Sequence, residues 1–175
     1  MTVAWFSAGG GGQGAVVSAE LQRRLVIMRH ADALPAGAED PDVTRSLSST
    51  GWRRAADRRE VIEQVSPQLI LCSAAARAVQ TLQALGPLPG QAVVEERLYT
   101  AGPSEWLLRM AEVGTEISRL MIIGHLPSIE QLAQGLIAGT HPELMFDPAS
   151  LAILDVASDW STLAPGQAHL LDFVA

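Results

Sequence analysis

Three segments of the sequence place an arginine or a histidine just beyond an apolar run that is typical of a buried strand. Arg29 and His30 follow residues 25–28, Arg77 follows residues 69–72, and His125 follows residues 120–123. Guanidinium groups bind phosphate through forked, charge-assisted hydrogen bonds, and an imidazole can act as a nucleophile. These side chains together predict phosphoryl transfer, in which one histidine attacks phosphorus and the other groups neutralise the phosphoryl oxygens.

The elements that must position these side chains are short strands separated by helices. Runs such as Leu25 to Met28 have no polar face, and strands of about 4–8 residues are the expected length for such runs. Strand and helix alternate three times along the chain, which indicates a three-layer α/β/α sandwich with a mostly parallel central sheet. The carboxyl ends of the strands in such a sheet form the crevice where ligands bind, so the arginines and histidines should converge there.

The helix and strand boundaries follow from caps, breakers and periodicity. Ser48 or Ser49 is expected to cap the first helix, and Ser73 is expected to cap a helix that carries Arg77 in its first turns. A phosphate there would meet a guanidinium and the amides of the helix start together. Helices are predicted over residues 52–64, from Ser73 to 85, 104–113 and 128–138, and further strands over 92–94, 151–156 and 168–174.

Composition limits the class of protein. The chain has 175 residues, 48% of them hydrophobic and 18% charged, which is typical of one globular domain with a core. The formal net charge is −7, and all 12 basic residues are arginine, so broad binding to nucleic acid or to an anionic membrane is not expected. The single cysteine excludes an internal disulfide. With no signal-peptide pattern or apolar span of about 20 residues, we predict a cytoplasmic protein.

The N-terminal segment is expected to stand apart from the domain. We divide the chain into a glycine-rich extension, residues 1–20, and one domain, residues 21–175. The run Gly9 to Gly14 fits the pattern G-x-G-x-x-G, and Asp32 follows the next strand, as in a dinucleotide site. Four consecutive glycines match many patterns through composition alone, so a loosely docked extension is the favoured interpretation.

Two other kinds of site do not fit the spacing. Four residues separate Cys72 from Arg77, whereas cysteine phosphatases need five with a glycine-bearing loop, so Cys72 is interpreted as a buried strand residue. The four histidines lack the spacing of metal ligands, and His141 and His169 lie outside the predicted crevice. No metal and no cofactor is therefore expected.

The chain resembles the histidine phosphatase superfamily, also called phosphoglycerate mutase-like, through motifs that occur in the family's order. They are Arg29-His30-Ala31, Cys72-Ser73 followed by Arg77-Ala78 and Gln80-Thr81, and Gly124-His125-Leu126-Pro127. The small size, the run Arg29 to Ala33, and Arg45-Ser46-Leu47 ahead of Gly51 are similar to the SixA-type phosphohistidine phosphatases. The resemblance spans residues 25–127, and the family's closing hairpin would account for the rest.

The resemblance implies a covalent mechanism and assigns a role to each matching residue. His30 would attack phosphorus through Nε2 and become phosphorylated, and water would then release phosphate. Arg29 and Arg77 would hold the phosphoryl oxygens. His125 would donate to the same oxygens. Arg45 would either contact the substrate or hold its own loop, and both interpretations stay open.

Departures from the family pattern bear on the substrate. Ala31 stands where the family usually has glycine, a change that the SixA-type pattern tolerates. Larger members carry a glutamate as general acid near residues 97–102, where this chain has none, although Glu95 and Glu96 lie just upstream. A phosphohistidine imidazole leaves with less help than an alkoxide does. We therefore expect a phosphatase that acts on a phosphorylated protein histidine in signal transduction; the alternatives are a small-molecule phosphomonoesterase and a non-catalytic phosphate-binding module.

Overall fold

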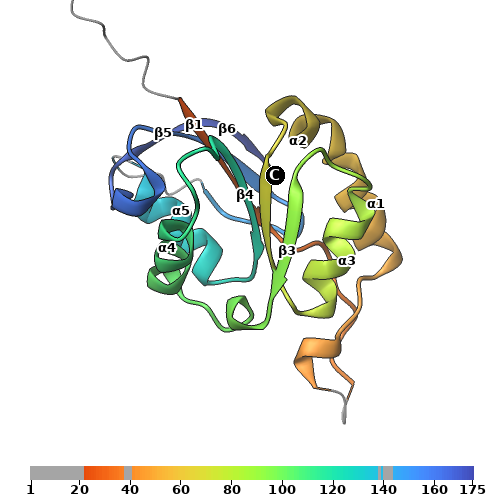
Figure 1. Ribbon diagram of the computed structural model, residues 1–175. Coiled ribbons are helices and arrows are strands. Elements are labelled where there is room, and N and C mark those ends of the chain that lie inside the picture. The colour runs from red at the N-terminus through yellow and green to blue at the C-terminus, as the bar shows by residue number, and fades with distance from the viewer. Residues whose placement is uncertain (1–21, 38–40, 138, 140–143) are drawn as a thin grey trace, which may run out of the picture.

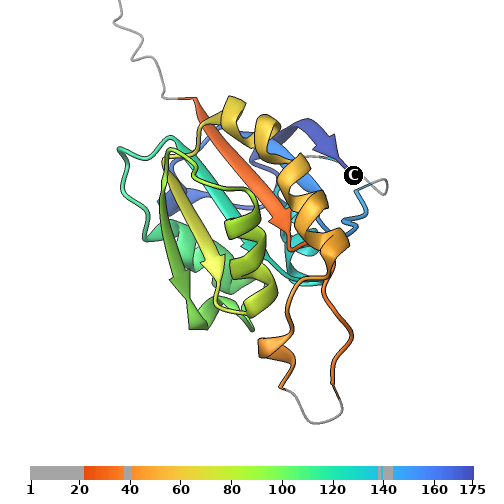
Figure 2. The same cartoon turned by 90° about the vertical axis from the view of Figure 1, so that its right-hand side faces the viewer.

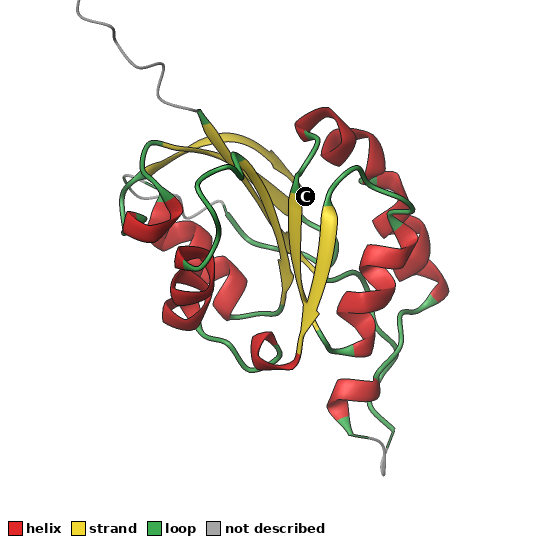
Figure 3. Ribbon diagram, viewed as in Figure 1, coloured by secondary structure: helices red, strands yellow, loops and turns green. Residues whose placement is uncertain are grey.

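The computed structural model describes residues 22–37, 41–137, 139 and 144–175. The predicted extension over residues 1–20, its glycine run and His141 lie outside the described residues. Within the described part of the chain, a central sheet carries helices on both faces (Figures 1 and 3). The three-layer α/β/α sandwich predicted from the alternating pattern is therefore confirmed.

The sheet has six strands in the order β3-β2-β4-β1-β5-β6. Strands β1 to β4 run parallel, and β5 pairs antiparallel with both β1 and β6. The parallel part of the sheet confirms the prediction, and β5 and β6 complete it as the expected strand pair. The strands are β1 (Arg23–Arg29), β2 (Leu69–Ser73), β3 (Gln91–Glu95), β4 (Arg119–Gly124), β5 (Leu151–Val156) and β6 (Ala168–Val174).

Five α-helices and three short 3-10 helices connect the strands in the described residues. Helices α1, α2 and α3 cover one face of the sheet, and α4 and α5 cover the other (Figure 1). The helices are α1 (Ser49–Asp57), α2 (Arg59–Val65), α3 (Ala76–Ala84), α4 (Pro103–Ala111) and α5 (Ser128–Leu136), with η1 (Asp42–Thr44), η2 (Glu96–Leu98) and η3 (Trp160–Thr162).

Alternation along the buried strands produces two hydrophobic layers. Leu25 and Ile27 on β1 pack with α4 and α5, whereas Val26 and Met28 pack with α1, α2 and α3. All four β1 side chains are fully buried. A strand that is apolar on both faces is what a sheet covered on both sides requires, which explains why the apolar runs show no polar alternation.

The first predicted helix, residues 52–64, is two helices in the structure. Ser48 is the N-cap of α1, and its hydroxyl accepts a hydrogen bond from the Gly51 amide at 3.0 Å. The helix is interrupted at Arg58, which ends α1 and precedes α2. The Arg58 guanidinium donates a hydrogen bond to the Ala149 carbonyl at 3.1 Å. A Cβ at Gly51 would lie 2.1 Å from the Asp32 carbonyl oxygen, so glycine lets α1 approach the loop after β1 closely.

The connection from β1 to α1 projects beyond the carboxyl ends of the parallel strands and carries η1 (Figure 2). Its two sides meet again at the bridge between Ala33 and Leu47. The connection therefore returns Asp42 and its neighbours to the edge where β1, β2 and β4 end. No helix in the described residues is long and apolar enough to span a bilayer.

Candidate active site

The two histidines predicted to converge lie side by side. His30 and His125 directly follow β1 and β4, which are neighbouring parallel strands, and Arg29 is in register with Gly124. The two imidazole ring centroids are 5.0 Å apart. The His30 amide also donates to the Gly124 carbonyl at 3.0 Å, so the backbone of β4 holds the nucleophile candidate in place.

Hydrogen bonds define the tautomer of His30. Its Nδ1 lies 2.7 Å from the Ala31 carbonyl oxygen, which can only accept, so Nδ1 carries the proton. Its Nε2 accepts a hydrogen bond from Nε of Arg77 at 3.1 Å. Burial lowers the pKa of His30 to about 4, with a smaller contribution from the positive charge of Arg77. At neutral pH the ring is therefore uncharged, and the lone pair of Nε2 faces the Arg77 guanidinium.

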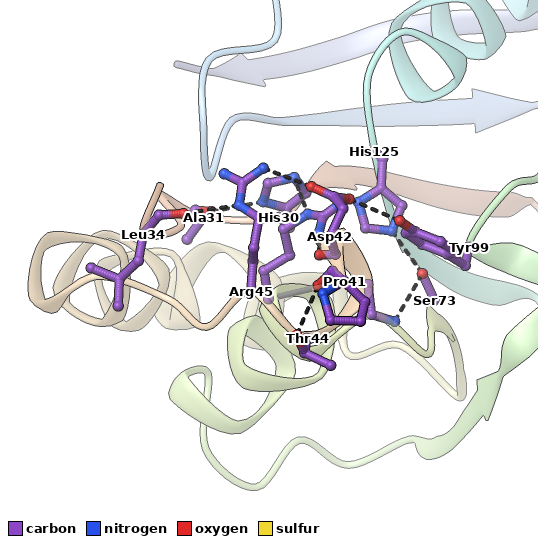
Figure 4. Close-up of polar contacts among 12 residues, drawn as sticks. His30, Ala31, Leu34, Pro41, Asp42, Thr44, Arg45, Ser73, Tyr99 and His125 are labelled. Carbon is purple, nitrogen blue, oxygen red and sulfur yellow. Dashed lines mark hydrogen bonds and ion pairs between the residues drawn. The ribbon is translucent and has the colours of Figure 1, made fainter. Parts of the chain in front are cut away.

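A hydrogen bond with Ser73 holds the His125 ring. Its Nε2 lies 2.7 Å from the Ser73 hydroxyl oxygen, and its Nδ1 is buried without a hydrogen-bond partner among the described residues. In Figure 4 the His125 ring faces His30 and Asp42. Burial, followed by the neighbouring His30, lowers the pKa of His125 to about 3, so this ring is also neutral at neutral pH.

The predicted cap at Ser73 is wrong. The N-cap of α3 is Ala75, which has no side-chain cap, and the Ser73 hydroxyl accepts a hydrogen bond from the Ala75 amide at 3.3 Å. Ser73 ends β2 instead and is fully buried. Because β2 and β4 are parallel neighbours, the Ser73 hydroxyl at the end of β2 is close to His125, which follows β4. Ser73 therefore binds His125 and does not cap α3.

Arg77 lies in the first turn of α3, as the sequence predicts. Thr81 connects this turn to the segment after His30, because its hydroxyl donates to the Arg77 carbonyl at 2.7 Å and accepts from the Ala31 amide at 3.0 Å. Gln80 binds the loop before α1, because its side-chain oxygen accepts from the Leu47 amide at 2.6 Å. The Gln-Thr pair of the sequence motif therefore positions both loops against the helix that carries the arginine.

Arg29 supplies a second guanidinium next to His30. Its Nη1 donates to the Phe146 carbonyl at 2.6 Å, and its Nε is buried without a hydrogen-bond partner among the described residues. Burial lowers the pKa of Arg29, although nearby carboxylates, Asp147 first among them, oppose this effect. An arginine whose Nε proton has no acceptor is poised to bind an anion.

Sequence reasoning did not identify Asp42 or Tyr99 as site residues. The Asp42 carboxylate accepts from Nη2 of Arg77 at 2.9 Å, from the Tyr99 hydroxyl at 2.8 Å and from Nη1 of Arg45 at 2.8 Å. Figure 4 shows it beside His30 and His125. Hydrogen bonds from Arg45 and then Tyr99 hold the pKa of Asp42 far below its usual range. No motif marked this aspartate, because Arg77 and Tyr99, which join it to the site, are distant in sequence.

Arg45 and the glutamates after β3 have defined partners. Arg45 holds its own loop, since its Nε donates to the Leu34 carbonyl at 2.9 Å while its Nη1 binds Asp42. The Glu95 carboxylate accepts from Arg109 at 2.6 Å and from Arg97 at 2.5 Å. Burial is the largest single effect and raises the pKa of Glu95, but the hydrogen bonds and charges of Arg97 and Arg109 together outweigh it and lower the pKa. Glu95 is therefore an ionised carboxylate.

The contacts of Cys72 and Asp32 indicate structural roles for both residues. Cys72 is fully buried on β2, and burial raises the pKa of its thiol to about 12, which agrees with its interpretation as an unreactive strand residue. Asp32 pairs with Arg54 at 3.2 Å. The described residues contain no group of histidine, cysteine and acidic side chains that could hold a metal ion.

A groove of about 260 Å³ opens beside His125. Its walls come from the loop after η2 and from the start of α5, and it includes Tyr99, Gly102, Leu126 and Gln131. The groove includes His125, whose ring centroid lies 5.0 Å from that of His30, so a group attached to a phosphoryl at the histidine pair has space to extend along the groove.

Comparison with curated proteins identifies relatives across most of the chain. An uncharacterized protein of Mycobacterium tuberculosis, Rv1276c, is 35% identical over 157 residues, which cover 83% of this chain and 98% of the relative. An uncharacterized protein of Mycobacterium leprae, ML1117, is 30% identical over 158 residues with the same coverage of both chains. No model of a protein family matches the sequence.

Solved structures of phosphohistidine phosphatases superpose on most of this chain. A candidate phosphohistidine phosphatase, SixA of Nakamurella multipartitia, superposes with a TM-score of 0.79 at 28% identity, covering 88% of this chain and 96% of that one. The protein histidine phosphatase SixA in complex with tungstate gives a TM-score of 0.73 at 25% identity, covering 87% and 96%.

Proposed function

The chain belongs to the histidine phosphatase superfamily, and from this membership we propose that it is a phosphatase that removes the phosphoryl group from a phosphorylated histidine of a protein. One observation carries the proposal: the uncharged Nε2 of His30 faces the Arg77 guanidinium. A neutral imidazole is nucleophilic, and a guanidinium in front of it would hold the phosphoryl oxygens during attack.

The reaction has two displacement steps. Nε2 of His30 attacks phosphorus, the bond from phosphorus to the substrate imidazole breaks, and the phosphoryl group is then bonded to His30. Water attacks this intermediate, releases inorganic phosphate and restores the free His30. Arg77 and Arg29 neutralise the charge of the phosphoryl oxygens in both steps. Nδ1 of His125 donates a hydrogen bond to one of these oxygens and keeps its proton.

The leaving group is the reason for choosing a phosphohistidine over an alkyl phosphate. An alkoxide needs a general acid in the transition state, and that help is typically worth about 10²–10⁴-fold. Asp42 at the site and Glu95 after β3 both accept hydrogen bonds from arginines, and the pKa of each carboxyl is lowered, so neither is suited to act as a general acid. A protonated imidazole departs as a neutral ring and needs no such acid.

The groove beside His125 suits a protein substrate. It includes His125 of the histidine pair and is lined by both polar residues, such as Gln131, and apolar ones, such as Leu126, whose exposed fraction is 39%. A peptide that presents a phosphohistidine to His30 would place its neighbouring residues in this groove. The TM-score and identity to SixA structures support the same substrate class.

The test compares three substrates. A histidine phosphotransfer protein phosphorylated by phosphoramidate, p-nitrophenyl phosphate and glycerol phosphate are each incubated with the protein, and phosphate release is measured. We expect the highest kcat/KM for the phosphohistidine protein, and an acid-labile phosphoryl group trapped on His30. Faster hydrolysis of glycerol phosphate would establish a phosphomonoesterase, and no turnover of any of the three would establish a phosphate-binding module.

A further inference from the structure

Every nitrogen of the Arg77 guanidinium already has a partner from the protein itself. Nε donates to His30, Nη1 donates to the Asp42 carbonyl at 2.8 Å, and Nη2 donates to the Asp42 carboxylate at 2.9 Å. Two oxygens of one residue thus meet the two terminal nitrogens of the fork. This is the arrangement in which arginine binds two oxygens of a phosphate or a carboxylate.

Asp42 supplies the counter-charge that a buried guanidinium needs. The Arg77 side chain is only 8% exposed, and a charge at such a position is costly unless it is paired. Asp42 provides that pair from the outside, because 46% of its own side chain is exposed. Tyr99 and Arg45 hold the carboxylate in this position through their own hydrogen bonds.

A phosphoryl group at His30 and the Asp42 carboxylate cannot share the fork. A phosphoryl group bound to both terminal nitrogens would need Nη2, which the Asp42 carboxylate occupies, and Nη1, which the Asp42 backbone carbonyl occupies. The phosphoryl group and the carboxylate are both anionic, so they would repel at short range. The connection from β1 to α1 projects beyond the sheet (Figure 2), and the Asp42 side chain on it is 46% exposed, whereas Arg77 lies in α3 and its side chain is only 8% exposed. The residue that must move when a phosphoryl group enters is therefore Asp42.

We infer that the Asp42 carboxylate competes with phosphoryl groups for the terminal nitrogens of Arg77. A phosphoryl substrate displaces Asp42 from Arg77, and the competition from Asp42 weakens binding of the inorganic phosphate product. The inference rests on the proposed function only in placing the phosphoryl group at Arg77. An anion that cannot outcompete Asp42 is excluded from the site, so this residue contributes to selectivity for phosphoryl groups. After turnover, the returning carboxylate favours release of phosphate.

The test measures binding of inorganic phosphate and of tungstate to the full chain by calorimetry, without turnover. Asp42→Asn keeps the shape of the side chain and removes its charge. A hydrogen bond between charged groups contributes roughly 10–100-fold, so we expect the Kd for phosphate to fall by about tenfold or more in this variant. Phosphate should also become a stronger product inhibitor by a similar factor.

A matched control removes a charge from another ion pair. Glu63 pairs with Arg59 at 2.7 Å on the surface of α2, so Glu63→Gln changes the net charge by the same amount away from the site. It should leave the Kd for phosphate unchanged. Circular dichroism confirms that both variants fold, which the exposure of Asp42 makes the expected result.

Arg77→Ala separates this inference from the proposed function. If Arg77→Ala abolishes phosphate binding while Asp42→Asn leaves the Kd unchanged or raises it, the fork binds phosphate but Asp42 does not compete for it. If Asp42→Asn reduces turnover without tightening phosphate binding, Asp42 takes part in the chemistry and the competition model is wrong. If Arg77→Ala binds phosphate as well as the parent does, the phosphate lies elsewhere and both proposals fail.

Discussion

The hydroxyl oxygen of Ser73 lies 2.7 Å from Nε2 of His125, and both residues are buried. The Ser73 oxygen accepts from the Ala75 amide, so its hydroxyl proton is available for Nε2. When Nε2 accepts, the proton of the neutral His125 ring resides on Nδ1. This is the nitrogen that has no partner among the described residues and that the proposed mechanism requires as a donor.

The first prediction is that Ser73→Ala lowers kcat by about 10–100-fold with little change in KM. The variant leaves Nε2 of His125 buried without a partner, so the ring loses the bond that fixes its tautomer, and an oxyanion donor typically contributes on this scale. Ser150→Ala is the matched control, because Ser150 is also fully buried and its hydroxyl has no partner among the described residues. Nitrogen-15 shifts of His125 should show the proton on Nδ1 in the parent. A parent ring protonated on Nε2 would contradict the assignment.

Replacement of His30 should remove the covalent route. We expect His30→Ala to reduce turnover by at least about 10³-fold while the protein stays folded, because the arginines can bind a phosphoryl group but cannot form the intermediate. Phosphate release and trapping of the phosphorylated protein provide the measurement. A variant that retains near-parent rates would show that His30 is not the nucleophile.

The depressed pKa values of the histidine pair predict a defined pH dependence. The pKa is about 4 for His30 and about 3 for His125, below the value near 6.5 expected in the unfolded chain. The unfolded state therefore binds more protons from about pH 6.5 down to about pH 4 at His30 and down to about pH 3 at His125. The stability that this pair contributes is complete above pH 6.5 and is lost as the pH falls through this window.

Histidine NMR resonances and denaturant unfolding test this pH dependence. The resonances of His30 and His125, assigned with the two alanine variants, should remain those of neutral rings at pH 6 and titrate only below about pH 5. The free energy of unfolding of the parent should fall more steeply with acid than that of His30→Ala. Titration of both rings with midpoints near 6.5 would rule out the buried, uncharged pair.

The forked geometry of Arg77 should matter beyond its charge. Lysine keeps the charge but cannot donate from two terminal nitrogens of one plane, so we expect Arg77→Lys to lose about 10–1000-fold in kcat/KM. Arg53→Lys, an exposed change on α1, serves as the control and should retain parent activity. Equal activity of the Arg77 variant and its parent would place the phosphoryl group away from this side chain.

The sequence predicted the sheet and the meeting of the two histidines because these features depend on local patterns. Apolar runs such as 120–123 define buried strands, and parallel strands bring their carboxyl ends to one edge. The same reasoning placed Arg77 in a first helical turn. Each of these inferences needs only the residues next to the strand end and the rule that strands connected through a helix run parallel in one sheet.

Contacts between distant segments could not be predicted in this way. Asp42 reaches Arg77, 35 positions further along the chain, from a connection whose described residues form no named strand or α-helix that would fix its direction. Ser73 has the residue type and position of a helix cap, and only the packing of β2 against β4 shows that its hydroxyl serves His125 instead. Hydrogen bonds between side chains on separate loops depend on the tertiary structure and leave no periodic signal.

The last prediction concerns substrate choice and follows from the ionised state of Glu95. We expect Glu95→Gln and Glu96→Gln to change kcat/KM for a phosphohistidine protein by less than about threefold, because Glu95 is bound to Arg109 and Arg97 and Glu96 is exposed. Glycerol phosphate should be a poor substrate for the parent, since its alkoxide lacks the general acid that is typically worth about 10²–10⁴-fold. The measurement is phosphate release from both substrates by the parent and both variants. Efficient hydrolysis of glycerol phosphate that is lost in either variant would identify a working acid and would change the assignment to a phosphomonoesterase.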